Sequence, residues 1–298
     1  MYVGVTDYDW YSMLKEQSCD EVNFWTPGGR SFRAISENEL FLFKLHAPRN
    51  YIVGGGFFVK FSQLPPYLAW DAFGIKNGVT SLDQLEERIN KYRSRNRMDS
   101  SNPQIGCIIL TEPFFFDEID WIPVPEDWSN SIVQGKRYST DTIAGEKLFD
   151  EVRYRLSSTD YVAEGARYTI SETKHRLGQG AFRIAVADAY QRRCAITGEK
   201  TLPVLEAAHI KPYGKGGEHS IPNGILLKSD FHTLFDKGYI TIDTDYRINV
   251  SDKLHSDYGN GKDYYKHNGE RLLIMPNDIN FHPSKASLQW HNENVYLG

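Results

Sequence analysis

The residues best suited to chemistry gather between positions 205 and 236. His209, Asn223, His232 and Asp236 follow one another in LEAAHIKPYGKGGEHSIPNGILLKSDFHTLFD. On a helix, His232 and Asp236 would share one face, where an imidazole nitrogen and a carboxylate oxygen can bind one divalent cation. A neutral His209 is suited to act as a general base toward water, because the unperturbed imidazole pKa lies near working pH. These residue types predict a site that hydrolyses phosphodiesters.

Short elements are predicted to hold these residues in place. Residues 203–209 form a β-like run, residues 211–222 a loop rich in Gly and Pro, and residues 224–228 a second short strand. Ser229 or Asp230 is suited to cap a helix that carries His232 and Asp236 and stops at Gly238. His209 would then face the helix across a gap wide enough for one phosphate, with the Asn223 amide tying the loop to the strand.

This stretch resembles the HNH endonuclease family, whose fold is the ββα-metal motif. His209, Asn223 and His232 stand at the three positions that give the family its name. The resemblance implies a catalytic site of these three residues, with His209 as general base. It also implies that His232 and Asp236 bind Mg²⁺ or Mn²⁺, with Ni²⁺ or Co²⁺ as substitutes in vitro.

One departure from the family leaves the third metal ligand open. The position before the first histidine is often a metal-binding Asp or His, and here it is Ala208. Water molecules could complete the coordination, or another acid such as Glu206 could join. On an ideal strand Glu206 points away from the side that His209 faces, which disfavours it. His219, in the loop, is a further candidate.

Length and composition set the wider limits. A chain of 298 residues predicts one large or two ordinary domains. It contains no run of 18 apolar residues, and its opening, MYVGVTDYDW, lacks the pattern of a signal peptide. Three cysteines lie far apart without a CxxC motif, which favours a reducing cytoplasm over a structural zinc site.

The charge distribution is compatible with DNA binding even though the net charge is −5. Phosphates respond to local basic patches, and two stretches of the chain, residues 91–97 and 172–193, are rich in Lys and Arg. The candidate contacts to the DNA backbone are Arg93, Arg95, Arg97, Arg176 and Arg183.

The first half of the chain differs in character from the second. Aromatic residues and short apolar runs at 39–46, 51–61 and 105–111 predict strands, and residues 7–17 and 81–92 predict helices. The motifs NFWTPGG, ELFLFKLHAPRNYIVGGG and AWDAFGIKNG resemble the EVE-type branch of the PUA-like superfamily. That resemblance implies an aromatic pocket for a modified nucleobase. Its candidate residues are Trp25, Trp70, Tyr51 and Phe58, with Asp71, Asn23 and Asn77 reading the base edge.

Together these patterns predict an α+β protein, with a PUA/EVE-like mixed β-barrel domain joined to a ββα-metal HNH domain. We expect residues 1–138 to recognise a modified base, residues 139–175 to form a linker with a helix, and residues 176–298 to form the nuclease. The predicted activity is modification-dependent restriction of double-stranded DNA that carries 5-methyl- or 5-hydroxymethylcytosine, by a homodimer without membrane contact.

Two alternatives stay open. A nuclease of this kind could select another mark, such as a phosphorothioate or a glucosylated base. The protein could instead be a non-catalytic nucleic-acid-binding regulator or RNA reader with a degenerate nuclease fold, which Ala208 favours.

Overall fold

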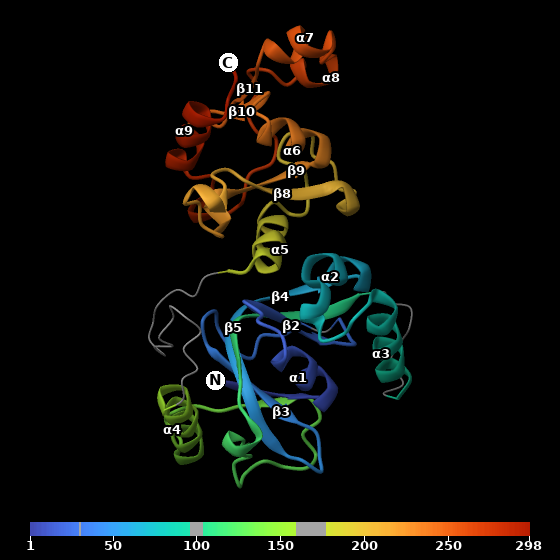
Figure 1. Cartoon of the computed structure of the whole chain (residues 1–298), viewed down its shortest axis with the longest axis vertical. Helices are drawn as coiled ribbons and strands as arrows, with labels where there is room; N and C mark the ends of the chain where they lie inside the picture. The colour runs from blue at the N-terminus through green and yellow to red at the C-terminus, as the bar shows by residue number, and fades with distance from the viewer. Residues whose placement is uncertain (30, 96–103, 159–176) are drawn as a thin grey trace. The chain divides into compact units, whose positions relative to one another are not determined.

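The computed structural model describes residues 1–29, 31–95, 104–158 and 177–298. The chain divides into an N-terminal unit, Met1–Arg176, and a C-terminal unit, Leu177–Gly298 (Figure 1). The first contains a large sheet with helices, and the second contains two-stranded sheets with helices. This organisation confirms the predicted α+β fold class.

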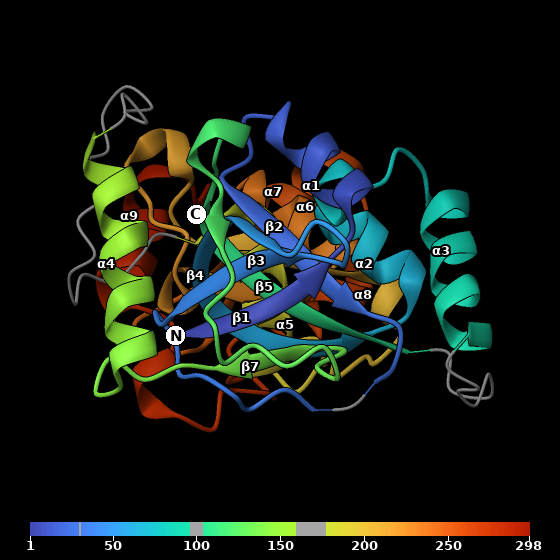
Figure 2. The same ribbon diagram turned by 90° about the horizontal axis from the view of Figure 1, so that it is seen from below.

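The described part of the N-terminal unit is built on one mixed sheet of seven strands, in the order β2-β5-β4-β3-β1-β7, with β6 paired to β4. β1 and β3 run parallel, and the other pairs are antiparallel. β7, β1 and β3 lie side by side in Figure 2. The strands are β1 Tyr2–Thr6, β2 Glu21–Thr26, β3 Leu40–Leu45, β4 Tyr51–Leu64, β5 Ile105–Phe115, β6 Ile122–Pro123 and β7 Gly135–Arg137.

Both faces of this sheet are buried, which explains the long apolar runs in the sequence. Successive side chains of β3 point to opposite faces. Phe41 and Phe43 therefore join one aromatic cluster, while Leu40 and Leu42 join a second cluster on the other side. The helices of this unit are α1 Tyr8–Lys15, α2 Pro66–Phe73, α3 Leu82–Arg95 and α4 Ile143–Ser158. α3 and α4 lie at opposite ends of the unit (Figures 1 and 2).

The N-terminal unit extends beyond residue 138, where the sequence pattern placed its end. Helix α4 carries Leu148, Val152 and Leu156 on one face, and all three are buried against the cluster that contains Leu40 and Leu42. Trp128 and Tyr138, which directly precede the predicted linker, are buried in the same cluster. The amphipathic pattern predicted the helix correctly but could not show which surface would cover its apolar face.

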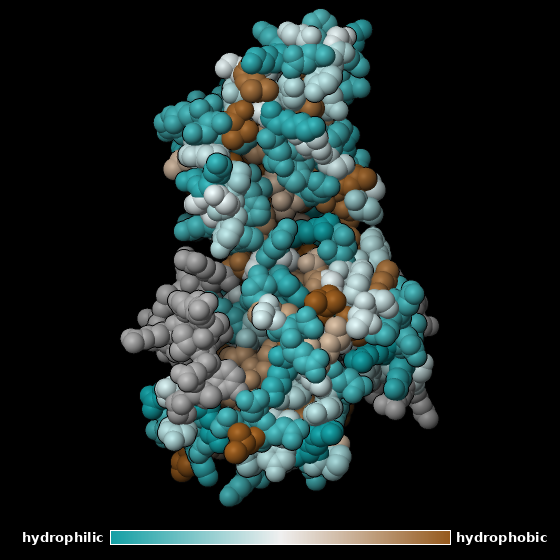
Figure 3. Space-filling view, viewed as in Figure 1, coloured by the Kyte–Doolittle hydropathy of each residue, from teal (hydrophilic) through white to brown (hydrophobic). Residues whose placement is uncertain are grey.

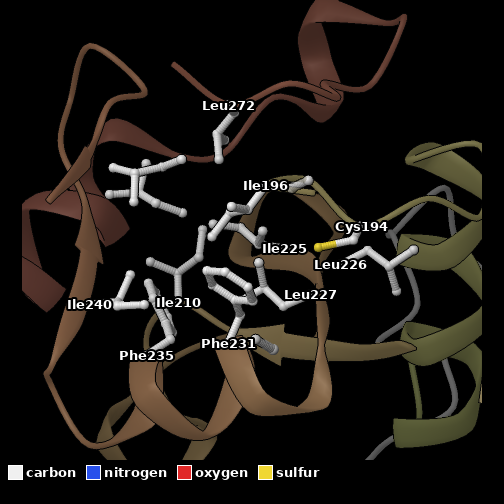
Figure 4. Packing of buried hydrophobic residues seen from close by; sticks show 14 of the residues in the cluster. Cys194, Ile196, Ile210, Ile225, Leu226, Leu227, Phe231, Phe235, Ile240 and Leu272 are labelled. Atoms are coloured by element: carbon white, nitrogen blue, oxygen red, sulfur yellow. The ribbon is translucent and has the colours of Figure 1, made fainter. Parts of the chain in front are cut away.

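The C-terminal unit begins with α5, Gln179–Ala189, which packs against an antiparallel pair of strands, β8 (Leu205–His209) and β9 (Gly224–Lys228). Helix α6, Ser229–Asp236, follows β9 directly and contacts both strands (Figure 1). Phe231 and Phe235 of α6 reach into the cluster formed with Ile225 and Leu227 of β9 (Figure 4).

A hairpin and three helices complete the C-terminal unit. They are β10 Ile240–Ile242, β11 Ile248–Val250, α7 Lys253–Tyr258, α8 Lys262–Tyr265 and α9 Lys285–Asn294. The face of the molecule in Figure 3 is mostly hydrophilic, with hydrophobic side chains in small separate patches. Within the four described segments, no helix combines the length and the apolar character needed to cross a membrane.

Candidate active site

Three consecutive elements of the C-terminal unit form the frame of the candidate site. His209 is the last residue of β8 and pairs with Gly224, the first residue of β9. α6 starts immediately after β9, so the chain turns back over the same pair of strands. Because Phe231 and Phe235 bury one face of α6, His232 and Asp236 lie on the adjacent, more exposed face.

The ends of α6 explain how the helix is limited to eight residues. Its N-cap is Lys228 and has no side-chain cap, which corrects the prediction that Ser229 or Asp230 occupies the capping position. Asp230 instead accepts a hydrogen bond from the backbone of Phe231 and pairs with the Lys228 ammonium. Gly238 has a φ of +77° and follows the helix, as the sequence predicted, because glycine tolerates this left-handed conformation.

Asn223 joins the two ends of the loop between the strands. Its Oδ1 accepts a hydrogen bond from the Lys211 amide at 3.0 Å, and its Nδ2 donates to the carbonyls of Lys211 and Glu218 at 2.9 Å. The side chain is buried, with 4% of its surface exposed. The loop that follows His209 is therefore fixed by the amide, which is the structural role that the sequence suggested.

His209 lies in a partly apolar environment that favours its neutral form. Its ring stacks on Phe182 of α5, with centroids 4.0 Å apart and planes within 13°. Burial lowers the pKa of His209 to about 4, assisted by His219 and His232 and opposed by Asp236. At neutral pH the imidazole is therefore unprotonated and able to accept a proton, as a general base requires.

His232 lies between two carboxylates. Its Nδ1 is 2.5 Å from Glu206 Oε2, and its Nε2 is 3.2 Å from Asp236 Oδ2. Burial alone would lower the pKa of His232, but hydrogen bonds with Asp236 and Glu206 outweigh burial and raise it above its ordinary value. The sequence predicted that Glu206 points away from the site, and this is wrong with respect to His232. Helix α6 packs on β8 and β9, which brings the His232 ring within reach of Glu206.

The geometry of His232 and Asp236 fits one divalent cation. Two ligands about 2.1 Å from an ion, in adjacent octahedral positions, lie about 3 Å apart, and Nε2 and Oδ2 are separated by 3.2 Å. Glu206 contacts the other ring nitrogen, so it would orient the ring from behind instead of binding the ion. Within the described residues, no group of three or more His, Cys, Asp or Glu side chains forms a metal site. Ala208 is fully buried in the apolar core.

Part of the predicted base pocket comes together in the N-terminal unit. Trp25 Nε1 donates a hydrogen bond to the Asn77 carbonyl at 3.0 Å. The Asn77 side chain is buried and bonded to Asn23 and to the carbonyls of Ala69 and Gly74, so it holds the structure together instead of facing a ligand. Trp70 and Asp71, neighbours of Ala69 on α2, are half-buried and exposed, respectively.

Two other predicted pocket residues lie elsewhere. Tyr51 begins β4 and packs against Trp121, with ring centroids 5.7 Å apart. Trp25 pairs with Cys107 of β5, and Cys107 pairs in turn with Ser62 of β4. Ser62 lies near the end of β4 opposite to Tyr51, so Tyr51 is far from Trp25 along the sheet. Phe58 is 6% exposed and belongs to the aromatic core. The aromatic composition could not separate these core residues from pocket residues.

The predicted phosphate contacts have different outcomes. Arg93 is buried, and its guanidinium donates hydrogen bonds to the carbonyls of Pro27 at 2.9 Å and Gln104 at 2.8 Å, which gives it a structural role. Arg183 lies half-buried on α5. The side chain of Arg95 and the whole of Arg97 and Arg176 lie outside the described residues.

Sequence reasoning missed the role of Phe182. Phe182 and Val186 are four residues apart in the sequence, a helical spacing that marks Phe182 only as an apolar residue. Its contact with His209 depends on tertiary packing, which no local pattern reports. His219 was considered as a metal ligand, whereas its ring lies beside His209 with centroids 5.0 Å apart.

One comparison with known proteins covers the candidate site. Residues 194–243 match the HNH endonuclease family. A comparison with curated protein sequences gave no match. Among solved structures, ASCH from Zymomonas mobilis is similar at 10% identity and a TM-score of 0.34, over 50% of this chain and 93% of that chain. The modification-dependent TagI restriction endonuclease is similar at 12% identity and a TM-score of 0.30, over 98% of this chain and 81% of that chain. At these TM-scores neither structural likeness supports a conclusion about function.

Proposed function

We propose that this protein is a metal-dependent endonuclease that cleaves double-stranded DNA carrying 5-methyl- or 5-hydroxymethylcytosine. The observation that carries the nuclease assignment is the pairing of a neutral His209 with the His232–Asp236 pair, within the stretch that matches the HNH family. The choice of a modified base rests on the resemblance of the N-terminal motifs to base-reading domains and on the partly exposed Trp25.

Each site residue of the C-terminal unit has a separate role in the proposed reaction. His209 accepts a proton from the attacking water, which its lowered pKa permits at neutral pH. His232 and Asp236 would hold the cation, with Glu206 fixing the His232 ring. When bound, Mg²⁺ or Mn²⁺ supplies a positive charge that binds a phosphate oxygen and stabilises the charge on the leaving oxygen. Asn223 keeps the loop after His209 in place.

The N-terminal unit offers groups suited to hold an extruded base. Trp25 is half-buried at the end of β2, and its ring could stack on a nucleobase, an interaction that contributes about 1–3 kcal/mol. Asn23 Oδ1 has no hydrogen-bond partner among the described residues, and because the side chain is fully buried it would accept from an amino group only if the structure opened around it. A flipped base is recognised by this combination of stacking and hydrogen bonding to its edge.

A substrate panel tests the proposal. Matched duplexes containing cytosine, 5-methylcytosine, 5-hydroxymethylcytosine, glucosylated 5-hydroxymethylcytosine or a phosphorothioate are incubated with protein and Mg²⁺ or Mn²⁺. We expect cleavage of the two modified-cytosine duplexes and loss of cleavage in His209→Ala. Equal cutting of every duplex would reject modification dependence. Preferential cutting of the glucosylated or phosphorothioate duplex would identify another mark, and binding without cleavage under any metal would favour a regulator.

We also propose that double-strand cleavage requires two copies of the chain. One HNH site cuts one strand, and a symmetric dimer would present two sites to the two strands. Sedimentation of the protein with and without modified duplex measures this directly. A monomer on DNA that still makes double-strand breaks in a single binding event would contradict the dimer.

A further inference from the structure

Two neighbouring histidines near the candidate site share an unusual feature. His209 Nε2 and His219 Nδ1 are both buried, and neither has a hydrogen-bond partner within the described part of the chain. Buried polar atoms in native proteins nearly always have a partner, so two such atoms on adjacent rings call for a common explanation. The second nitrogen of each ring also has no hydrogen-bond partner among the described residues, but it is not buried, so it retains some contact with solvent.

The positions of three rings indicate how the two histidines meet. Phe182 covers one face of His209 at 4.0 Å, with the planes within 13°. His219 is 5.0 Å from His209 and 5.7 Å from Phe182, and its plane is inclined by 70° and 73° to theirs. With Phe182 on the face of His209, these separations place His219 beside the ring edge. Ring N–H groups donate in the plane of the ring, so the edge is where a partner for Nε2 must lie.

We propose that His219 is a positioning residue for His209: the two buried nitrogens are not bonded as the rings stand, and a small rotation of the adjacent rings lets His219 Nδ1 accept a hydrogen bond from His209 Nε2–H. This contact fixes His209 in the tautomer that carries its proton on Nε2. The lone pair of Nδ1 is then exposed to solvent. His219 carries its own proton on the solvent-facing Nε2, so both rings are neutral and both buried nitrogens are satisfied.

The tautomer matters for the proposed hydrolysis, on which the catalytic meaning of this inference rests. The attacking water gives one proton to His209 Nδ1, and its oxygen forms a bond to phosphorus as the bond to the leaving oxygen breaks. His209 is then an imidazolium, and its Nε2–H remains bonded to the neutral His219. With the proton on Nδ1 instead, the nitrogen open to solvent would have no lone pair to accept it.

Two substitutions separate the hydrogen bond from the packing. His219→Asn places an amide oxygen near the position of Nδ1 and retains the acceptor. His219→Phe retains an aromatic ring against Tyr213, which packs on His219 at 4.6 Å, but removes the acceptor. Circular dichroism and thermal melting establish that each variant is folded.

The direct measurement is the tautomer of His209 in the full chain without metal or DNA. Nitrogen NMR of protein labelled with ¹⁵N-histidine at about pH 8 distinguishes protonated from unprotonated ring nitrogens, since neutral imidazole dominates there. The signal of His209 is identified as the resonance that the wild type shows and His209→Ala lacks. We expect the Nε2–H tautomer in the wild type and in His219→Asn, and a mixture in His219→Phe. An Nδ1–H tautomer in the wild type, or no change in His219→Phe, would overturn the proposal. An Nδ1–H tautomer in the wild type overturns the proposal even if a variant does not fold.

Cleavage kinetics provide the second measurement. We expect His219→Phe to slow single-turnover cleavage by about 10- to 100-fold, the usual effect of removing an outer partner of a catalytic histidine. DNA affinity should not change, and His219→Asn should restore most of the rate. If the protein cleaves no DNA but shows the dependence of the tautomer on His219, the proposed function fails while the positioning contact stands. If both variants cleave DNA as fast as the wild type and the His209 tautomer does not change, the proposed function stands and the positioning contact fails.

Discussion

Glu206 accepts a hydrogen bond from His232 Nδ1 at 2.5 Å, on the side of the ring opposite Asp236. A carboxylate in this position makes the other nitrogen more basic and keeps it aimed at the ion. We therefore expect Glu206→Gln to raise the dissociation constant for Mn²⁺ by about 10- to 100-fold. Calorimetric titration of Mn²⁺ into the full chain measures this constant. Glu218→Gln, in the exposed part of the loop, is the matched control. Equal affinities in the wild type and Glu206→Gln would remove Glu206 from the site.

His291 illustrates a buried histidine with a structural use. Its ring stacks on Phe235 at 3.8 Å, Nδ1 is 2.8 Å from Thr241 Oγ1, and Nε2 donates to the Phe235 carbonyl at 3.1 Å. The side chain is only 2% exposed, and burial lowers the pKa of His291 to about 4. The neutral ring satisfies both hydrogen bonds, whereas the protonated ring would be a buried cation.

This lowered pKa predicts a pH dependence of stability. The unfolded chain has an ordinary histidine pKa of about 6.5, so between pH 6.5 and pH 4 it binds more protons than the folded chain. The contribution of His291 is thus complete above about pH 6.5 and is lost as the pH falls toward 4, by at most about 3 kcal/mol. Urea unfolding at several pH values measures the free energy of unfolding. His291→Gln should show a smaller loss over this interval, and an identical slope would contradict the assignment.

At the scale of elements, the contact between α5 and β9 depends on Gly224. A Cβ atom at this position would be 2.4 Å from Val186 Cγ2 and 2.9 Å from Phe182 Cζ. We expect Gly224→Ala to destabilise the C-terminal unit by about 1–3 kcal/mol, because the core must expand. Cleavage should fall as well, since Phe182 supports His209. Thermal melting and the cleavage rate test both expectations. Gly214→Ala is the control, because its Cβ would have no neighbour within 4 Å. A stable and fully active Gly224→Ala would show that the packing is not tight here.

Much of the local structure of the C-terminal unit could be predicted because each signal is local. The run Gly224–Lys228 is bounded by a Pro-containing loop and a helix start, and the structure has a strand with the same bounds. Gly238 ends α6 through its own backbone conformation. Helix α4 was also identified by its pattern, but its docking on the N-terminal sheet depends on surfaces that are distant in sequence.

The candidate site was predicted less completely, for a related reason. The spacing of His232 and Asp236 on one helix fixes their proximity, and the structure has them 3.2 Å apart. The contacts of Glu206 with His232 and of Phe182 with His209 join separate elements, so no sequence period reports them. Tyr51 shows that proximity in sequence can also mislead. It lies within a motif that predicted the base pocket, but it begins a 14-residue strand whose other end is the part near Trp25.

At the scale of the whole molecule, the two compact units separate the proposed tasks. His209 belongs to the C-terminal unit and Trp25 to the N-terminal unit, and each has its own buried core. Substitutions in one unit should therefore leave the other folded. This separation makes recognition and cleavage independently measurable.

We expect Trp25→Ala to weaken binding to a duplex with 5-methylcytosine by about 5- to 150-fold, which corresponds to the loss of one stacked base. Its affinity for plain duplex should stay the same, because that affinity comes from phosphate contacts. His209→Ala should bind both duplexes like the wild type while cutting neither. Fluorescence anisotropy without metal measures the affinities. Tyr51→Ala is the control, since this side chain is 38% exposed and packs on Trp121 away from Trp25. If Trp25→Ala and Tyr51→Ala reduce the preference for the modified duplex equally, the reader site lies elsewhere in the N-terminal unit. If neither does, the preference for modified DNA arises outside these residues.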